Sequence, residues 1–338
     1  MMQVIDFGPL APFIEDDSIT DINYNGSGLW IDHLKKGRYH VEFEEDEFMQ
    51  QLFYKIANYV NQSFNTSSPL VEAETKELRI SLLHDSIARS GHSLSIRKTP
   101  AVLRIDEKNA VKSELMSKEI LEFLIAAIKG HCNILVNGLP GSGKTELIKF
   151  LSSYIADKER IITIEDTLEL RIHDIFKEKD CVAMKVNDGF SYAQAIKASL
   201  RQRPDWILVS EVRSHEVVHL LESISTGTHL LSTIHTNDAF KIPQRILHMF
   251  PNVEIYNEVL LNSIYEAIDL GIHVESEITS KGITRKITQI VAFDSVDHQP
   301  NSTLLFDIHQ KIDLYSALND RLKEKCQIKA PTRRKRTK

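Results

Sequence analysis

The chain has 338 residues, which is long enough for two domains with separate hydrophobic cores. Its composition, 42% hydrophobic and 26% charged, is ordinary, so we expect a folded, soluble protein. The net charge of −6 argues against a dedicated nucleic-acid-binding protein, because such proteins carry an excess of Lys and Arg.

Two further classes are excluded by simple patterns. No apolar run approaches the ~18 residues that a membrane helix needs, and the N-terminus lacks the basic and apolar stretches of a signal peptide. The three cysteines, Cys132, Cys181 and Cys326, are scattered without a C-x-x-C pair. This spacing indicates a reducing compartment and no zinc site.

Residues 1–100 are predicted to form a separate α/β domain. Strand-like runs cover 18–25, 29–31, 39–43, 78–83 and 93–97, with turn signals between them. Acidic residues at 42–47 precede apolar residues at helical spacing from Phe48 to Val60, which predicts one long helix. Four or five strands and one helix fit a small mixed domain with one covered face.

The rest of the chain predicts a larger α/β domain. Residues 101–112 are expected to be a linker, 113–330 the second domain, and 331–338 a disordered basic tail. Predicted strands at 132–137, 160–165, 206–210 and 230–234 alternate with predicted helices after Gly143 and at 192–200 and 215–224, and another helix at 118–129 precedes them. This alternation predicts a mostly parallel sheet with helices on both faces, and runs at 267–274 and 286–293 predict extra strands at one edge.

Residues 138–145 read Gly-Leu-Pro-Gly-Ser-Gly-Lys-Thr, a complete G-x-x-x-x-G-K-T phosphate loop between a predicted strand and a predicted helix. Glycines let main-chain N–H groups point inward at a phosphate chain, and the helix adds the positive end of its dipole. Lys144 supplies a charge for the terminal phosphates, and Thr145 supplies a hydroxyl ligand for Mg²⁺. The predicted ligands of ATP are Gly138, Leu139, Pro140, Gly141, Ser142, Gly143, Lys144, Thr145 and Glu146.

Three other strand ends should converge on this loop, because the carboxyl ends of neighbouring parallel strands meet at one edge of a sheet. The first carries Glu165 and Glu169, whose carboxylates can hold Mg²⁺ or orient water, although an acid-rich turn has the same pattern. The second carries Glu211, placed to polarise water or steady the metal, and Arg213, which could pair with Glu169 or reach a phosphate. The third carries His235, which could sense the γ-phosphate or be structural.

These segments give the candidate site. The candidate catalytic residues are Glu165, Glu169, Glu211, Lys144, Arg213 and His235, and the candidate metal ligands are Thr145, Glu165 and Glu211.

In this order, the segments resemble the motifs of the secretion ATPase superfamily, the motors of type II and type IV secretion, conjugation and type IV pilus machines. Residues 165–169 look like the family's Asp box, 200–213 like its Walker B region, and 226–238 like its His box. Near the N-terminus, residues 19–26 are similar to the family's opening strand motif. Arg79 and Arg97 look like the arginines that close on the nucleotide.

The resemblance covers most of the chain. It implies a PAS-like N-terminal domain, a RecA-like ATPase domain and a homohexameric ring that hydrolyses ATP in the cytoplasm, at the inner face of the cytoplasmic membrane. The implied partners are other copies of the chain and inner-membrane secretion or pilus platform proteins, with peripheral membrane contact and no specific nucleic acid.

The chain departs from the family pattern at two places. The family has Thr-Gly-His at the start of the His box, whereas this chain has Thr226-Gly227-Thr228 and His229 one place later, so only His235 is carried over. The tetracysteine module of many type II members is absent, which favours the conjugation, type IV secretion or tight-adherence branches. Two other functions are considered: a nucleotide-gated scaffold with little turnover, and a nucleic-acid motor, which the acidic net charge disfavours.

Overall fold

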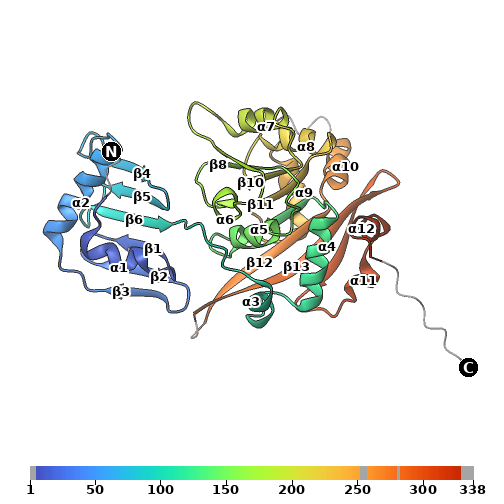
Figure 1. Cartoon of the computed structure of the whole chain (residues 1–338), viewed down its shortest axis with the longest axis horizontal. Coiled ribbons are helices and arrows are strands. Elements are labelled where there is room, and N and C mark those ends of the chain that lie inside the picture. The colour runs from blue at the N-terminus through green and yellow to red at the C-terminus, as the bar shows by residue number, and fades with distance from the viewer. Residues whose placement is uncertain (1–4, 252–256, 280–281, 329–338) are drawn as a thin grey trace, which may run out of the picture. The chain divides into compact units, whose positions relative to one another are not determined.

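The computed structural model describes residues 5–251, 257–279 and 282–328, and the chain divides into two compact units (Figure 1). The first unit comprises residues 1–101 and 277–284, and the second comprises residues 102–276 and 285–338. The predicted basic tail at 331–338 lies outside the described residues. No helix in the described part of the chain combines the length and apolar character that crossing a bilayer requires.

The first unit is built on a six-stranded antiparallel sheet with the strand order β3-β2-β1-β6-β5-β4. The strands are β1 (Ile19–Tyr24), β2 (Leu29–His33), β3 (Gly37–Val41), β4 (Leu70–Glu74), β5 (Leu78–Leu83) and β6 (Ser93–Lys98). The helical segments are η1 (Gly8–Leu10), α1 (Ala11–Glu15) and α2 (Asp46–Tyr59). The predicted strand runs are confirmed, but β4 was missed because two of its five residues are glutamates, which have low strand propensity.

One face of this sheet is buried under α2. The helix buries Met49, Leu52, Phe53, Ile56 and Ala57, the face that the apolar spacing predicts. The strands alternate to match it, and in β5 the side chains of residues 78, 80 and 82 point into the core. The other face of the sheet therefore carries the side chains at the intervening positions, among them residues 79 and 97.

The second unit contains an eight-stranded sheet with the order β14-β13-β12-β7-β11-β10-β8-β9. The strands from β12 to β9 in this order pair in parallel, and β13 and β14 pair antiparallel. The strands are β7 (Ile134–Asn137), β8 (Ile161–Glu165), β9 (Cys181–Lys185), β10 (Trp206–Val212), β11 (His229–Ile234), β12 (Leu270–Thr279), β13 (Gly282–Val296) and β14 (Gln299–Asp307). The prediction of a mostly parallel sheet is confirmed, and the late strands extend it beyond β7.

Helices cover both faces of this sheet (Figure 1). They are α3 (Glu107–Lys112), α4 (Lys118–Lys129), α5 (Lys144–Ser152), α6 (Ile172–Ile175), α7 (Tyr192–Leu200), α8 (Val217–Ser225), η2 (Ala239–Lys241), α9 (Ile242–Leu247), α10 (Asn257–Ala267), α11 (Leu314–Ala317) and α12 (Asp320–Lys325). Successive residues of β7 enter opposite cores: Ile134 and Val136 pack with α4 and α5, and Leu135 packs with α7 to α10. The predicted helices at 118–129 and 192–200 have those bounds because Ser117 and Ser191 cap them. Within the segment expected to be a linker, Asp106 and Asn109 form a capping box that begins α3.

A buried carboxylate fastens the last helix to the strand that leads into the phosphate loop. Asp269 is fully buried, and its Oδ2 accepts the main-chain N–H of Asn133, at the start of β7, at 2.7 Å. From α12, the Arg321 guanidinium and the Lys325 ammonium reach the two oxygens of Asp269, each at 2.8 Å. All three cysteines are free thiols, and Cys132 and Cys326 lie in the core beside this cluster.

Asp269→Ala should therefore destabilise the second unit. The change leaves the buried N–H of Asn133 and the Lys325 ammonium without their acceptor, and it removes the charge that faces Arg321, which keeps the carbonyl oxygen of Glu266. Because the two cations are about one-third exposed, we expect a loss of about 2–3 kcal/mol, below the ~3–5 of a fully buried pair. Urea denaturation of the full chain measures this loss. Asp320→Ala is the matched control, because Asp320 lies in α12 beside Arg321 and its side chain is fully exposed. Equal losses in the two variants would contradict the fastening role of Asp269.

Candidate active site

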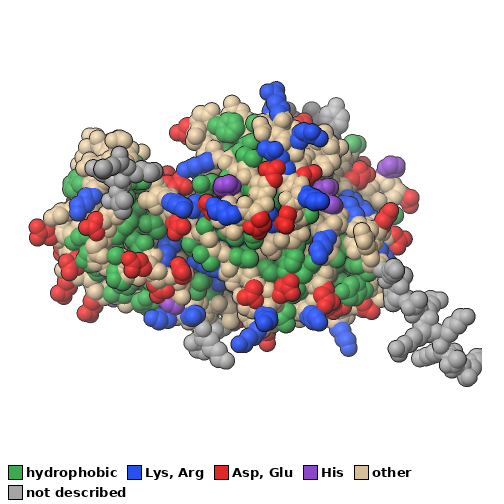
Figure 2. Space-filling model, viewed as in Figure 1, with side chains coloured by type: hydrophobic (Ala, Val, Ile, Leu, Met, Phe, Trp, Pro, Cys, Tyr) green, Lys and Arg blue, Asp and Glu red, His purple; other side chains and the backbone are tan. Residues whose placement is uncertain are grey.

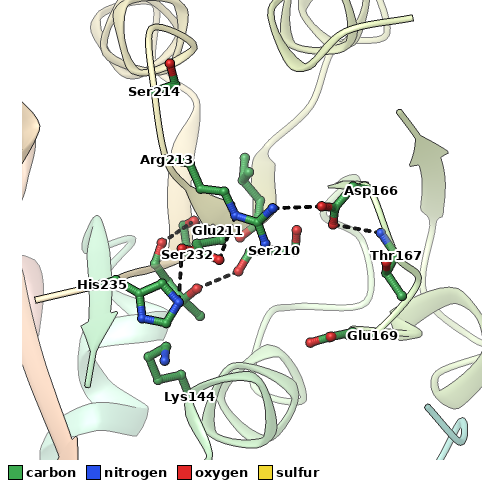
Figure 3. A network of polar contacts seen from close by, with 12 residues as sticks. Lys144, Asp166, Thr167, Glu169, Ser210, Glu211, Arg213, Ser214, Ser232 and His235 are labelled. Carbon is green, nitrogen blue, oxygen red and sulfur yellow. Dashed lines mark hydrogen bonds and ion pairs between the residues drawn. The ribbon is translucent and has the colours of Figure 1, made fainter. Parts of the chain in front are cut away.

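The carboxyl ends of four neighbouring parallel strands bring the predicted residues together (Figure 3). Strand β7 leads into the phosphate loop, and β11, β10 and β8 lie beside it in that order. Lys144, Glu169, Arg213 and His235 follow these strands, and Glu211 is the second-last residue of β10, although the five residues are up to 91 positions apart (235 − 144). The sheet therefore assembles one polar site from four separate segments.

The phosphate loop has a conformation that requires glycine at three places. Gly138, Gly141 and Gly143 have φ angles of +146°, +79° and +97°, in the region that other residues rarely adopt. A Cβ atom on Gly138 would also lie 2.2 Å from the carbonyl oxygen of Val274 in β12. The loop is thus held against the neighbouring strand, with its main chain shaped for an anion.

Lys144 begins α5 and points back over the loop. Its Nζ donates to the carbonyl oxygens of Gly138 at 2.9 Å and Leu139 at 3.0 Å. Burial lowers the pKa of Lys144, and the nearby carboxylates of Glu211 and Glu169 oppose this shift. The ammonium is therefore held by neutral carbonyl acceptors. A phosphate oxygen can take their place, because its hydrogen bond with the ammonium is charge-assisted and stronger.

Glu211, near the end of β10, is the centre of an ion-pair network (Figure 3). Its Oε2 lies 2.7 Å from Nε of Arg213, and its Oε1 lies 3.1 Å from Nε2 of His235. The other ring nitrogen of His235 faces the carbonyl oxygen of Gly138 at 3.2 Å, so the imidazole bridges Glu211 and the phosphate loop. Arg213 also reaches Asp166 at 2.8 Å, and it pairs with Glu211 and Asp166 rather than with Glu169.

The two glutamates that follow β8 have different surroundings. The Glu165 carboxylate is buried, and its Oε2 accepts the main-chain N–H groups of Glu169 and Leu170, both at 2.8 Å. Burial raises the pKa of Glu165 to about 7, although the two N–H bonds favour the charged form. Glu169, in contrast, accepts the hydroxyl of Thr145 at 3.4 Å. Glu165 thus shapes the turn that presents Glu169 to the phosphate loop.

Two residues of the site were not predicted from the sequence. The Tyr192 hydroxyl accepts the main-chain N–H of Asp166 at 3.0 Å and lies 3.1 Å from the hydroxyl of Ser210, so it joins the ends of β8 and β10. Arg285, in β13, lies on the phosphate loop with its Nε 3.4 Å from the carbonyl oxygen of Gly141. Neither belongs to a recognisable local pattern, because both act through residues that are distant in the sequence.

The residues present fit a nucleotide with its metal ion. Ser142 Oγ and Glu146 Oε2, both in the loop region, are buried with no hydrogen-bond partner. These two oxygen atoms can therefore form hydrogen bonds with a ligand or with water. Thr145 and Glu169 offer adjacent hard oxygen atoms of the kind that Mg²⁺ prefers. Glu165 has its Oε2 engaged in the protein interior, which makes it a weaker candidate for a metal ligand than Glu169.

Two other candidates, and the displaced His229, lie elsewhere. Arg79 and Arg97 belong to the first unit, where they are cross-strand neighbours on β5 and β6, and Arg97 pairs with Asp21 at 2.9 Å. Their role at a nucleotide remains a prediction. His229 begins β11, whereas His235 follows its end, so the two histidines lie at opposite ends of the strand. The His229 ring packs on Trp206 at 5.3 Å between ring centroids, and burial lowers its pKa to about 4.

Known proteins resemble this chain in sequence and in fold. Residues 3–270 match the family model described as "Type II/IV secretion system protein". An uncharacterized protein of Bacillus anthracis is 26% identical over 296 residues, which cover 84% of this chain and 67% of that protein. The conjugal transfer protein TrbB of Rhizobium radiobacter is 26% identical over 289 residues, or 83% and 86% of the two chains. The crystal structure of the pilus retraction motor PilT with bound ADP has the same fold, with a TM-score of 0.62, 22% identity, and coverage of 88% and 85%.

The raised pKa of Glu165 makes stability depend on pH. Because the pKa is about 7 in the folded chain and ordinarily 4.5, the folded state binds the proton more tightly, and the free energy of unfolding falls as pH rises through this window. Glu165→Gln keeps an acceptor for the two N–H groups but removes the charge. We therefore expect the variant to gain stability relative to wild type between pH 5 and pH 8, by roughly 1–3 kcal/mol.

Denaturation midpoints of both proteins at the two pH values measure this difference. If the stability difference between Glu165→Gln and wild type were the same at pH 5 and pH 8, the carboxyl group would not be the source of the pH dependence.

Proposed function

Because the chain belongs to the family of type II/IV secretion system proteins, we propose that it is a hexameric ATPase that drives such a machine. In this proposal, ATP with Mg²⁺ binds at the phosphate loop, and hydrolysis does mechanical work on inner-membrane secretion, conjugation or pilus platform proteins. The protein acts in the cytoplasm at the inner face of the cytoplasmic membrane. The relatives named for conjugal transfer and pilus retraction support this class of function.

The observation that carries the proposal is the position of Glu211. A carboxylate near the end of β10, with only β11 between it and the phosphate-loop strand β7, supports the proposal because it could take a proton from water that attacks a terminal phosphate. Its two oxygens are oriented by Arg213 and His235. Such a base would be preorganised, because His235 is fixed to the end of the neighbouring strand β11 and Arg213 is held by its second partner, Asp166.

The roles of the other residues follow from their contacts. Bound Mg²⁺–ATP supplies the phosphoanhydride and a metal that neutralises developing negative charge. Lys144 would exchange its two carbonyl acceptors for phosphate oxygens, and main-chain N–H groups of the phosphate loop would bind the phosphate chain. Thr145 and Glu169 would hold the metal ion. His235 links Glu211 to Gly138, so a displacement of the loop is transmitted to the base.

A nucleotide-gated scaffold with little turnover is the second candidate, and one observation favours it. Both oxygens of Glu211 are already engaged by Arg213 and His235, an arrangement that restricts the access of water to the carboxylate. A nucleic-acid motor has less support, since basic and acidic side chains are interspersed on the face shown in Figure 2. Steady-state hydrolysis by the purified chain, with and without membranes that contain the platform proteins, separates the first two candidates.

Glu211→Gln should keep ATP binding but slow hydrolysis by about 100-fold or more, because the amide preserves shape and removes the base. Lys144→Ala is the paired variant, and it should lose both binding and turnover. Fluorescent-nucleotide binding and phosphate release measure the two properties. A wild-type rate no higher than that of Lys144→Ala would favour the scaffold, and normal turnover in Glu211→Gln would remove Glu211 as the base.

Tyr192→Phe should lower kcat with little change in the affinity for ATP. The phenyl ring keeps the packing, but the hydroxyl that joins Asp166 to Ser210 is lost, and Asp166 in turn orients Arg213. Loss of one such hydrogen bond, about 1 kcal/mol, corresponds to roughly a fivefold slower step. A double-mutant cycle with Asp166→Asn tests the path, because residues that act through one contact give non-additive effects. Purely additive losses would mean that Tyr192 acts independently of Asp166.

A further inference from the structure

A cluster of two histidines and an aspartate closes the β5–β6 hairpin in the first unit. His84 and Asp85 directly follow β5, and His92 directly precedes β6. One ligand atom from each of the three residues lies within 4.8 Å of the other two. Across residues 5–251, 257–279 and 282–328, no second group of three or more His, Cys, Asp or Glu residues has this closeness. The proposed ATPase function makes no use of the cluster.

The protons in this cluster can be assigned from the main chain. The N–H of Asp85 donates to Nδ1 of His92 at 2.9 Å, and the N–H of Ser86 donates to Nδ1 of His84 at 3.1 Å. A main-chain N–H can only donate, so both Nδ1 atoms carry a lone pair and no proton. Yet Oδ1 of Asp85 lies 3.0 Å from Nδ1 of His84, and its Oδ2 lies 3.7 Å from Nδ1 of His92. Three lone-pair donors thus face one another, an arrangement that favours a cation among them.

The distances and the burial suit a transition metal. In a tetrahedral site with bonds of about 2.0–2.1 Å, neighbouring ligand atoms lie about 3.3 Å apart. Oδ1 of Asp85 lies 3.0 Å from Nδ1 of His84 and Oδ2 lies 3.7 Å from Nδ1 of His92, both close to this value, whereas the three ligand atoms as a group lie within 4.8 Å of one another, so the cluster would contract around an ion. The imidazole side chains are 13% and 6% exposed, and the His92 ring is fixed against Phe53 and Phe64 at 5.2 and 5.1 Å between centroids. Asp85, in contrast, is 58% exposed, so an ion and a water ligand can enter from its side.

We propose that His84, Asp85 and His92 form a binding site for a divalent transition metal ion of the Zn²⁺ class, with the fourth position open to water. Two imidazoles and one carboxylate select such ions over Mg²⁺, which prefers an all-oxygen octahedral shell. The cysteine pattern predicts no zinc site, and this site is compatible with that pattern because it uses no thiolate.

Binding must displace the two main-chain N–H groups from the Nδ1 atoms, and also the Ser86 hydroxyl, which lies 3.0 Å from Nδ1 of His84, so we expect a reversible site rather than a permanently occupied one. The ion would tie together the two ends of the loop between β5 and β6. That hairpin carries Arg79 and Arg97 in register near its other end, so its rigidity bears on two predicted nucleotide ligands.

The test uses the full chain, stripped of metal with a chelator and titrated with Zn²⁺ and, separately, with Mg²⁺ in the absence of nucleotide. Isothermal titration calorimetry should show a Zn²⁺ site in wild type that is weakened at least tenfold in Asp85→Asn and in His84→Gln. Asp85 is exposed, so its substitution leaves the core intact, and His40→Gln is the matched control because His40 is an exposed histidine of the same unit. Co²⁺ should give tetrahedral absorption bands in wild type that both site variants lose.

Other histidines of the chain could bind Zn²⁺ weakly, so the difference between variants decides the matter. Equal Zn²⁺ affinity and equal Co²⁺ spectra in wild type, Asp85→Asn and His84→Gln would overturn the proposal, as would a wild type that binds no Zn²⁺. A loss that appears equally in His40→Gln would place the ion elsewhere and overturn it too.

Discussion

The parallel pairing of four strands is the constraint on which the rest of the second unit depends. Asn137 at the end of β7 is in register with Ile234 of β11, and Ile234 is in register with Val212 of β10. This pairing fixes where each strand ends, and the polar residues that follow are fixed with it. A single-residue slip in one pair would move its terminal side chain to the other face of the sheet. The positions of the site residues therefore depend on the main-chain hydrogen bonds that pair these strands.

Three charged side chains around the phosphate loop, Lys144, Glu211 and Glu165, already have partners. The Lys144 ammonium is held by carbonyl oxygens, Glu211 by Arg213 and His235, and Glu165 by main-chain N–H groups. An arriving anion must exchange partners with several of these groups rather than enter an empty cradle. Such an exchange couples binding at the loop to the orientation of residues on the neighbouring strands, since His235 contacts Gly138 of the loop and Glu211 of β10.

Much of the fold could be predicted, because local signals determine it. The helices at 118–129 and 192–200 have capping serines and a clear apolar face, and the phosphate loop is specified by its own eight residues. Strands β4, β9 and β14 were missed, since short or partly exposed strands depend on their neighbours more than on their own sequence. Proximity of Glu211 and His235 to the loop followed from strand topology alone.

The partners within the site could not be predicted. The inward orientation of Glu165 depends on the turn at Glu169 and Leu170, and Arg213 could equally have turned towards Glu169. Arg285 contacts Gly141 although the two residues are 144 positions apart in the chain, and no local sequence pattern predicts this contact. Burial and side-chain direction are properties of the assembled structure, and these decide which of several nearby carboxylates faces a metal.

The extent of the folded scaffold differs from the extent of the recognisable family segment. The family match ends at residue 270, at the first residue of β12, yet β12 pairs with β7 and its Val274 carbonyl confines the phosphate loop at Gly138. Further along the chain, Leu322 of α12 and Cys326 at its end belong to the same hydrophobic core as the β7 residues Ile134 and Val136. A shortened chain cut at the family boundary would leave β7 unpaired on one side and its core open. Recombinant truncation, domain exchange and gene fusion should therefore respect a C-terminal boundary beyond Cys326, 56 residues past the family match (326 − 270).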